Sequence, residues 1–369
     1  MGHYIWQRKG WPNFTFDSNQ LINLLAQARQ AQGQVIGKAD FMGIEQQSSV
    51  LVEEAFTTSA IEGEKLNKTD IRSSVARRLG LSTAGMALPP RHIDGLVEAL
   101  LDATTNYNKE LNQTRLFSWH AGLFPTGYSG IHKIKVGKWR DHKEPMQMIS
   151  GQAGKEKVHY QAPPSAEVGK EMKAFFKWWK SSQGKVDGIL RAGIAHFWFV
   201  SIHPFDDGNG RLARTITDMA LAQDEQTGRR LYSLSSQILQ NRKQYYDILE
   251  KSQKGDCDIT AWLVWYLDLF KRALHASQSS IDLAVQVAKF WQDHSQLELN
   301  GRQLKVVKKL LEAGPHGFEG GLTNRKYVSM TKVSRETAKR DLADLEQKGF
   351  LKRRPGKGRA VAYDLFSYW

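Results

Sequence analysis

The segment from residue 190 to residue 205, LRAGIAHFWFVSIHPF, is apolar on nearly every side. A helix with apolar residues all round has to be buried, so this segment predicts a central helix of the core. The chain then continues DDGNGRLAR through residue 214. A histidine, carboxylates, flexible glycines and two guanidinium groups are therefore crowded together directly after a buried helix.

Most of the remaining chain shows apolar residues at helical spacing, and strand-like alternation is scarce, which predicts a mainly α fold. We expect a first long helix capped by Asp17 or Ser18. Further helices are expected from about residues 46, 68, 91, 190, 245 and 259. Turn residues separate short extended pieces between residues 136 and 164, which predicts a β-hairpin.

The chain changes character after residue 300. Residues 301–314 and 324–333 predict short helices, Ser334 is placed to cap a third, and PGKGRAVAYDLF has the Gly and Pro of a tight hairpin. Three helices followed by a basic hairpin form the winged-helix layout, so we expect a winged-helix domain at residues 291–369.

The net charge of +14 is unevenly placed, since residues 301–369 hold 16 Lys and Arg against 7 Asp and Glu. This excess predicts polyanion binding by the C-terminal domain, with Ser334–Lys348 as the helix that reads DNA. The basic side chains available to DNA from this helix and the hairpin are Arg335, Lys339, Arg340, Lys352, Arg353, Arg354, Lys357 and Arg359. A solubilising basic surface and a protein-docking module stay open as alternatives.

Cysteine usage and hydropathy indicate the compartment. The one cysteine, Cys257, excludes an internal disulfide and a Cys-based zinc site, and it favours the reducing cytoplasm. The stretch MGHYIWQRKGWPNF lacks the apolar core of a signal peptide. No apolar run approaches the roughly 18 residues of a membrane span, so we expect no membrane association.

The segment HPFDDGNGRLAR, residues 203–214, has the parts of a phosphate site. Gly208 and Gly210, around Asn209, can aim successive N–H groups at an anion, and the start of the following helix adds partial positive charge. Arg211 and Arg214 lie one helical turn apart, and each matches phosphate oxygens.

Two further side chains of this segment suit nucleotide chemistry. Asp207 offers an oxygen ligand for Mg²⁺, and His203 is the candidate base that takes a proton from an attacking hydroxyl. Together these parts suit phosphoryl or nucleotidyl transfer. The alternative is a plain connection between two helices, in which the Asp and Gly residues act only as caps.

HPFDDGNGRLAR resembles the signature of Fic-domain proteins, HPFx(D/E)GNGRxxR, and matches it at every fixed position. The resemblance implies a helical Fic core that transfers AMP from ATP to a Tyr, Ser or Thr hydroxyl of a target protein. It implies that His203 deprotonates that hydroxyl and that Asp207 holds Mg²⁺. It also implies that Gly208–Gly210 binds the α- and β-phosphates, Arg211 a phosphate and Arg214 the γ-phosphate.

The likeness extends over about residues 45–275. The hairpin resembles the family's flap, which implies that Val158, His159 and Tyr160 clamp a target segment by strand addition. A plain exposed hairpin is the alternative. The segment NRKQYYDILEKS resembles the one that contacts adenine, which implies nucleoside contacts from Tyr245 and Tyr246. One of the two rings must face inward on a helix, so we also expect at least one core tyrosine.

The stretch TTSAIEGEKL, residues 57–66, resembles the family's inhibitory motif (S/T)xxxE(G/N) through Thr58, Glu62 and Gly63. Thr58 and Glu62 share a helical face, and Gly63 ends the helix. A carboxylate at a helix carboxyl end favours a cationic partner, which Arg214 would supply. Glu62 would then withhold Arg214 from the γ-phosphate. Alternatives are an ordinary surface Glu and a Glu62 that orients water to remove AMP from a labelled protein.

These features predict three domains. An aromatic arm and helix, residues 1–44, would pack on a Fic domain, residues 45–290, whose inhibitory helix covers about residues 46–62; the winged helix follows. Self-modification and a homodimer are further expectations. Two other functions stay open: a DNA-binding regulator that senses nucleotide without transferring it, and a Fic transferase that uses another nucleotide.

Overall fold

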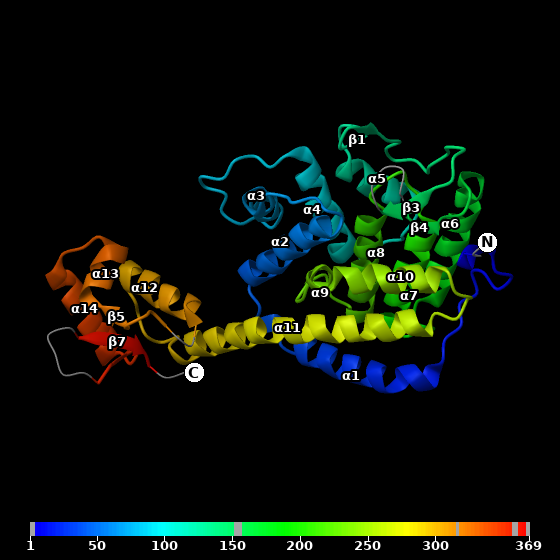
Figure 1. Ribbon diagram of the computed structural model, residues 1–369. Coiled ribbons are helices and arrows are strands. Elements are labelled where there is room, and N and C mark those ends of the chain that lie inside the picture. Colours follow the sequence, from blue (N-terminus) through cyan, green and yellow to red (C-terminus); the bar gives the residue numbers. More distant parts are fainter. Residues whose placement is uncertain (1–3, 151–156, 315–316, 356–360, 367–369) are drawn as a thin grey trace. The chain divides into compact units, whose positions relative to one another are not determined.

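The computed structural model describes residues 4–150, 157–314, 317–355 and 361–366. The chain divides into two compact units, Met1–Gln278 and Ser279–Trp369. The first unit is mainly helical, as the sequence predicts (Figure 1). Within the described residues, no helix is both long and apolar enough to cross a membrane.

The helices up to α11 are η1 (Ile5–Gln7), α1 (Ser18–Ile36), η2 (Ala39–Phe41), α2 (Ile44–Ile61), α3 (Lys68–Arg78), α4 (Arg91–Thr105), α5 (Gln113–Leu123), α6 (Ser165–Ser182), α7 (Gly188–Ile202), α8 (Asn209–Glu225), α9 (Leu234–Gln240), α10 (Arg242–Gln253) and α11 (Thr260–Asp293). Two antiparallel hairpins interrupt them, β1 (Tyr128–Ser129) with β2 (His132–Lys133), and β3 (Gln147–Ser150) with β4 (Lys157–Gln161).

Helix α7 is the centre of the first unit. Its side chains are buried from Ile189 through Ile202, and it packs along α8 (Figure 1). The Asp187 carboxylate accepts the backbone N–H groups of Ile189 and Leu190 at 2.9 and 3.2 Å, so the helix has a side-chain cap at its start. The predicted buried helix is thus confirmed, and the chain segment after it emerges from the middle of the core.

The aromatic arm before α1 packs against this core. Trp6 donates its indole N–H to the Gln161 carbonyl at the end of β4, at 2.8 Å. The Phe14 ring meets the rings of Phe197 and Trp198 edge-on, with centroids 5.7 and 5.6 Å apart. Helix α1 begins after Asp17, whose side chain accepts the Asn19 N–H, as the sequence predicts.

The second unit has its own core. It contains α12 (Gly301–Glu312), β5 (Leu322–Thr323), α13 (Asn324–Thr331), α14 (Arg335–Gln347), β6 (Leu351–Arg353) and β7 (Ala362–Leu365). The strands form an antiparallel sheet of order β5-β7-β6, and buried side chains of α12, α14 and this sheet pack together. Ser334 caps α14 by accepting the Thr337 N–H at 3.1 Å. Assignment as a winged helix stays a prediction.

The structure describes six of the eight basic residues that are predicted to face DNA. Arg335, Lys339 and Arg340 are exposed on α14, and Lys352 and Arg353 are exposed on β6. Arg354 pairs with Asp364 of the neighbouring strand at 2.6 Å. The predicted contacts Lys357 and Arg359 lie outside the described residues.

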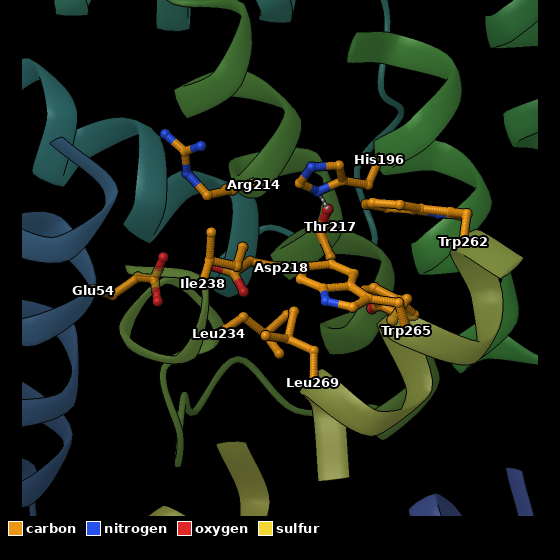
Figure 2. A pocket seen from close by; sticks show the side chains of 11 residues that line it. Glu54, His196, Arg214, Thr217, Asp218, Leu234, Ile238, Trp262, Trp265 and Leu269 are labelled. Carbon is orange, nitrogen blue, oxygen red and sulfur yellow. Dashed lines mark hydrogen bonds between the residues drawn. The ribbon is translucent and has the colours of Figure 1, made fainter. Parts of the chain in front are cut away.

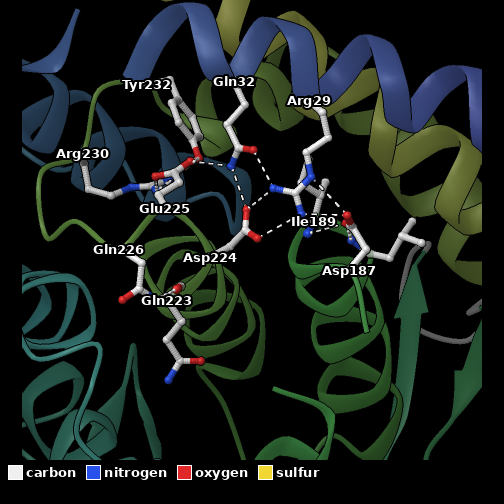
Figure 3. Close-up of polar contacts among 11 residues, drawn as sticks. Arg29, Gln32, Asp187, Ile189, Gln223, Asp224, Glu225, Gln226, Arg230 and Tyr232 are labelled. Carbon is white, nitrogen blue, oxygen red and sulfur yellow. Dashed lines mark hydrogen bonds and ion pairs between the residues drawn. The ribbon is translucent and has the colours of Figure 1, made fainter. Parts of the chain in front are cut away.

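A polar network joins α1 to α8 inside the first unit (Figure 3). Arg29 of α1 pairs with Asp187 at 2.7 Å and with Asp224 at 2.5 Å. Beside it, Arg230 pairs with Asp218 of α8 at 2.6 Å, and these two side chains are only 6% and 3% exposed. Removing one partner from such a pair leaves a charge buried without compensation.

We therefore expect Arg230→Met to lower the free energy of unfolding by about 3–5 kcal/mol. The matched control is Arg229→Met next to it, because Arg229 and its partner Asp40 are 46% and 96% exposed. A surface pair of this kind contributes less than about 1 kcal/mol. Chemical denaturation followed by tryptophan fluorescence measures both, and equal losses would contradict the assigned role of Arg230.

Candidate active site

His203 terminates the buried helix α7 and turns the chain out of the core. Its backbone is left-handed, with φ of 51°, and its N–H bonds to the Phe199 carbonyl. Imidazole Nδ1 lies 3.2 Å from the Val200 carbonyl oxygen; since a carbonyl only accepts, Nδ1 carries the hydrogen and Nε2 the lone pair. Burial lowers the pKa of His203 to about 4, although the Val200 carbonyl favours the charged form. The ring is therefore neutral at pH 7, with Nε2 able to accept a proton.

The turn after His203 is closed by its own side chains. Asn209 accepts the Phe205 N–H at 2.9 Å and donates to the Phe205 carbonyl at 2.8 Å. Gly208 has φ of 79°, and a Cβ there would lie 2.8 Å from the Phe124 ring, so only glycine fits. Helix α8 starts directly behind it at Asn209, and its first N–H groups have no carbonyl of the same helix to bind. This helix start can therefore receive an anion.

Asp207 is held beside that helix start by groups distant in sequence. Its carboxylate accepts the Gly208 N–H at 2.5 Å and contacts the Ser129 hydroxyl from the β1–β2 hairpin. The buried His120 of α5 accepts the Gly137 N–H through Nδ1 at 3.1 Å, so its Nε2 donates to the Asp207 carbonyl at 3.2 Å. The Asp207 carboxylate is thus fixed in place by hydrogen bonds and keeps free acceptor capacity.

Arg214 is 2% exposed and bonds to α2, the helix predicted to be inhibitory. Its Nε and Nη2 donate to the Thr58 hydroxyl and carbonyl at 2.7 and 2.8 Å, and Nη2 also donates to Glu62 Oε1 at 2.7 Å. A Cβ at Gly210 would lie 2.1 Å from that Oε1, so the Glu62 carboxylate lies directly against the start of α8. Burial alone would lower the pKa of Arg214, but the Glu62 charge, the hydrogen bond to Glu62 and the neighbouring tyrosines together raise this pKa.

Arg211 meets a second carboxylate from the same segment. Its Nη1 lies 3.0 Å from Glu64 Oε2, and its guanidinium lies over the Phe124 ring, 4.9 Å from the centroid. Among the described residues, Arg211 Nε and Arg214 Nη1 are buried and have no hydrogen-bond acceptor. Two guanidinium groups with spare buried donors thus lie at the start of α8.

The predicted tyrosine pair is divided between core and surface. Tyr245 is 1% exposed, and its hydroxyl lies 2.9 Å from His196 Nε2. His196 Nδ1 in turn lies 3.0 Å from the Thr217 hydroxyl, in the wall of a cavity that also touches Arg214 (Figure 2). Tyr246 is 40% exposed, and its hydroxyl lies 3.4 Å from the carbonyl of Ile61, the residue before Glu62.

The cavity of Figure 2 is not a nucleotide site. It measures about 10 Å³, which is room for one water molecule. A nucleotide contact by Tyr245 would require its ring to leave the core, whereas Tyr246 already lies beside the end of α2 and is partly open to solvent.

The hairpin predicted as a flap is anchored on both α7 and α10. Tyr160 of β4 is 1% exposed and donates its hydroxyl to the Ser201 carbonyl at 2.8 Å. His159 Nδ1 lies 2.5 Å from Glu250 Oε2 of α10. Val158 opposes Ile149 of β3, which is 57% exposed. Strand β4 is therefore held next to the residues that lead into His203.

No group of three or more His, Cys, Asp or Glu side chains able to hold a metal occurs among residues 4–150, 157–314, 317–355 and 361–366. A single carboxylate, that of Asp207, is enough for a metal ion that takes its remaining ligands from a bound phosphate and from water, as Mg²⁺ commonly does. The fit is therefore to a shared ion and not to a site built from protein ligands alone.

The structure brings most of the predicted residues together at the start of α8. These are His203, Asp207, Gly208, Asn209, Gly210, Arg211 and Arg214, with Thr58 and Glu62 bonded to Arg214; Gly63 follows at the end of α2. Sequence reasoning missed Glu64, Ser129 and His120. Only Glu64 gave a signal, as a second acid two residues beyond Glu62.

Comparison with known proteins agrees with this geometry. The family description "Fic/DOC family" matches residues 110–221, and "Domain of unknown function (DUF4172)" matches residues 4–81. The chain is 27% identical over 203 residues to a protein adenylyltransferase Fic of Nematostella vectensis, an alignment that covers 54% of this chain and 43% of the relative. It is 27% identical over 206 residues to the protein adenylyltransferase fic-1 of Caenorhabditis elegans, covering 54% and 36%. The chain thus matches less than half the length of each relative.

One solved structure shares the fold over nearly the whole chain. A Fic family protein from Desulfovibrio desulfuricans superimposes with a TM-score of 0.62 at 18% identity, covering 96% of this chain and 98% of that one. The helix pair α7 and α8, with the signature between them, falls within the matched residues 110–221. The chain therefore carries a Fic domain.

Proposed function

We propose that this chain is a protein adenylyltransferase that transfers AMP from ATP to a hydroxyl of a protein side chain and is restrained by its own Glu62. The observation that carries the proposal is the meeting of three features at one point. They are the neutral His203 with a free Nε2, the start of α8 without a side-chain cap, and two arginines with spare buried donors. The names of the relatives support AMP transfer.

In the proposed reaction the target oxygen forms a bond to the α-phosphorus of ATP, and pyrophosphate leaves. His203 Nε2 takes the proton of the attacking hydroxyl. The start of α8, with Gly208–Gly210, binds the α- and β-phosphates, and Arg211 and Arg214 bind the outer phosphate oxygens. Strand β4, through Val158 and His159, holds the target segment by adding a strand, while Tyr160 anchors β4 to the core.

Asp207 would hold Mg²⁺ jointly with the phosphates, and its bonds to Gly208 and Ser129 orient the carboxylate for this role. When bound, the ion would supply positive charge to the phosphate oxygens. Tyr246 would contact the nucleoside from α10.

Glu62 restrains the reaction because it takes the place that a γ-phosphate would need. Its carboxylate lies on Arg214 and against Gly210, so ATP has to displace it or bind in another pose. Glu64 withholds Arg211 in the same way. The other role proposed for Glu62, orienting water to remove AMP, predicts that AMP release from a labelled protein is lost when Glu62 is replaced.

Several sequence predictions stay predictions. They are the cytoplasmic location, self-modification, a homodimer, and DNA or protein binding by the C-terminal unit. The rival functions, a nucleotide-sensing regulator and a transferase for another nucleotide, differ from the proposal in what they attach to protein.

We expect Glu62→Gly to raise AMP incorporation about tenfold or more. A hydrogen bond between charged groups contributes about 1.5–3 kcal/mol, and tenfold corresponds to about 1.4 kcal/mol. Incorporation of radioactive AMP from α-labelled ATP measures the effect. The matched control is Glu53→Gln on the same helix, whose carboxylate pairs with Lys68 and reaches neither arginine. A Glu62→Gly protein no faster than the parent would contradict the restraint.

Intact-mass spectrometry of Glu62→Gly after incubation with each nucleoside triphosphate tests the substrate. We expect an adduct of AMP mass with ATP, and we expect Glu62→Gly/His203→Ala to form none because the proton acceptor is missing. If an adduct forms only with UTP or GTP, that nucleotide and not ATP is the substrate. No adduct with any of them would favour a nucleotide sensor.

The pH dependence follows from the lowered pKa of His203, about 4. A base is active when unprotonated, so the rate stays level as pH falls through the range near 6.5 where an ordinary histidine becomes charged. We expect kcat/KM of Glu62→Gly to decline only below about pH 5. An acid limb centred near pH 6.5 would contradict the lowered pKa of His203.

A further inference from the structure

Arg140 binds three successive carbonyl groups at the end of α7. Its Nε donates to the His203 carbonyl at 2.7 Å and its Nη2 to the Ile202 carbonyl at 3.3 Å, and its backbone N–H donates to the Pro204 carbonyl at 2.9 Å. The side chain is almost fully buried, at 1% exposure. One residue therefore fixes the backbone on both sides of the candidate base.

The same guanidinium also holds the chain that follows strand β4. Nη2 donates to the Pro163 carbonyl at 2.5 Å, and Nη1 donates to the Ser165 hydroxyl at 2.9 Å. Pro163 is two residues beyond the end of β4. Arg140 thus ties the strand proposed to hold the target to the residue proposed to deprotonate it.

The His203 backbone needs such support. Its left-handed conformation is uncommon for a residue other than glycine and persists only where the surroundings enforce it. A positive charge at the carboxyl end of a helix is also favourable. Burial lowers the pKa of Arg140 to about 10, so the guanidinium stays charged at neutral pH.

We propose that Arg140 is a positioning residue, which holds His203 and the end of strand β4 in one fixed arrangement so that an incoming hydroxyl meets imidazole Nε2. The role of Arg140 in AMP transfer rests on the proposed function of the chain. Arg140 itself touches neither nucleotide nor target in this role, and it acts through the backbone carbonyls that it binds.

The chain offers a matched control in Arg191. It is 2% exposed, and like Arg140 it donates to a hydroxyl and a carbonyl, those of Ser182 and Trp179, at 3.0 and 2.8 Å. Burial lowers its pKa to about 10 as well. Arg191 lies near the start of α7, at the opposite end of the helix from His203. Arg140→Lys and Arg191→Lys therefore remove similar bonds at different distances from the site.

Two measurements on the full chain test the proposal. In the Glu62→Gly background, Arg140→Lys should lower kcat for AMP transfer by about 10- to 100-fold with KM for ATP within about twofold, whereas Arg191→Lys should change kcat by less than about threefold. Independently of transfer, the His203 imidazole resonance, assigned by its loss in His203→Gln, should move in Arg140→Lys and stay in place in Arg191→Lys.

A His203 resonance that does not move in Arg140→Lys would overturn the proposal, as would an equal loss of kcat in Arg191→Lys. If Arg140→Lys does not fold, Ser165→Ala takes its place, because it removes only the acceptor of Nη1. A shifted resonance then supports the proposal and an unshifted one overturns it. If Glu62→Gly itself forms no AMP adduct, the proposed function fails, and the resonance alone decides whether Arg140 positions His203.

Discussion

The charge of Arg214 organises the site. A guanidinium that is 2% exposed cannot lose its proton at neutral pH, so the fold has to surround it with acceptors. Helix α2 supplies them through Thr58 and Glu62. The interaction that packs α2 against α8 is therefore the same one that we propose as the restraint. Because a phosphate is also an anion, it can replace the Glu62 carboxylate without leaving Arg214 uncompensated, and Nη1 offers a further donor.

The helix pair places opposite polarities at the two ends of one short turn. The carboxyl end of α7 carries His203, and the amino end of α8 begins after Gly208. Carbonyl groups gather at the first end, where the Val200 carbonyl orients the His203 imidazole, and free N–H groups at the second end form an anion cradle. The carboxyl end of α7 needs hydrogen-bond donors for its last carbonyl groups, and Arg140 supplies them to Ile202 and His203.

Local patterns were sufficient to predict much of this. The buried helix, the caps at Asp17 and Ser334 and the clustering of residues 203–214 all depend on neighbours in sequence. Contacts across the fold could not be predicted that way. Ser129 reaches Asp207 over 78 residues, and Glu64 reaches Arg211 over 147. Because Tyr245 and Tyr246 are neighbours on one helix, one of the two rings had to face the core. It is Tyr245, whose hydroxyl bonds to His196 of another helix.

The two matched regions of the chain form one site. The Fic match begins at residue 110, yet both carboxylates that hold its arginines, Glu62 and Glu64, come from the match at residues 4–81. The same N-terminal region supports strand β4, because Trp6 binds the Gln161 carbonyl and the Tyr4 ring meets the Tyr160 ring at 5.3 Å. The segment that matches a domain of unknown function thus contacts both the arginine side and the strand side of the site. A Fic core without it would leave Arg214 without its main acceptors, so we infer that the two regions fold together.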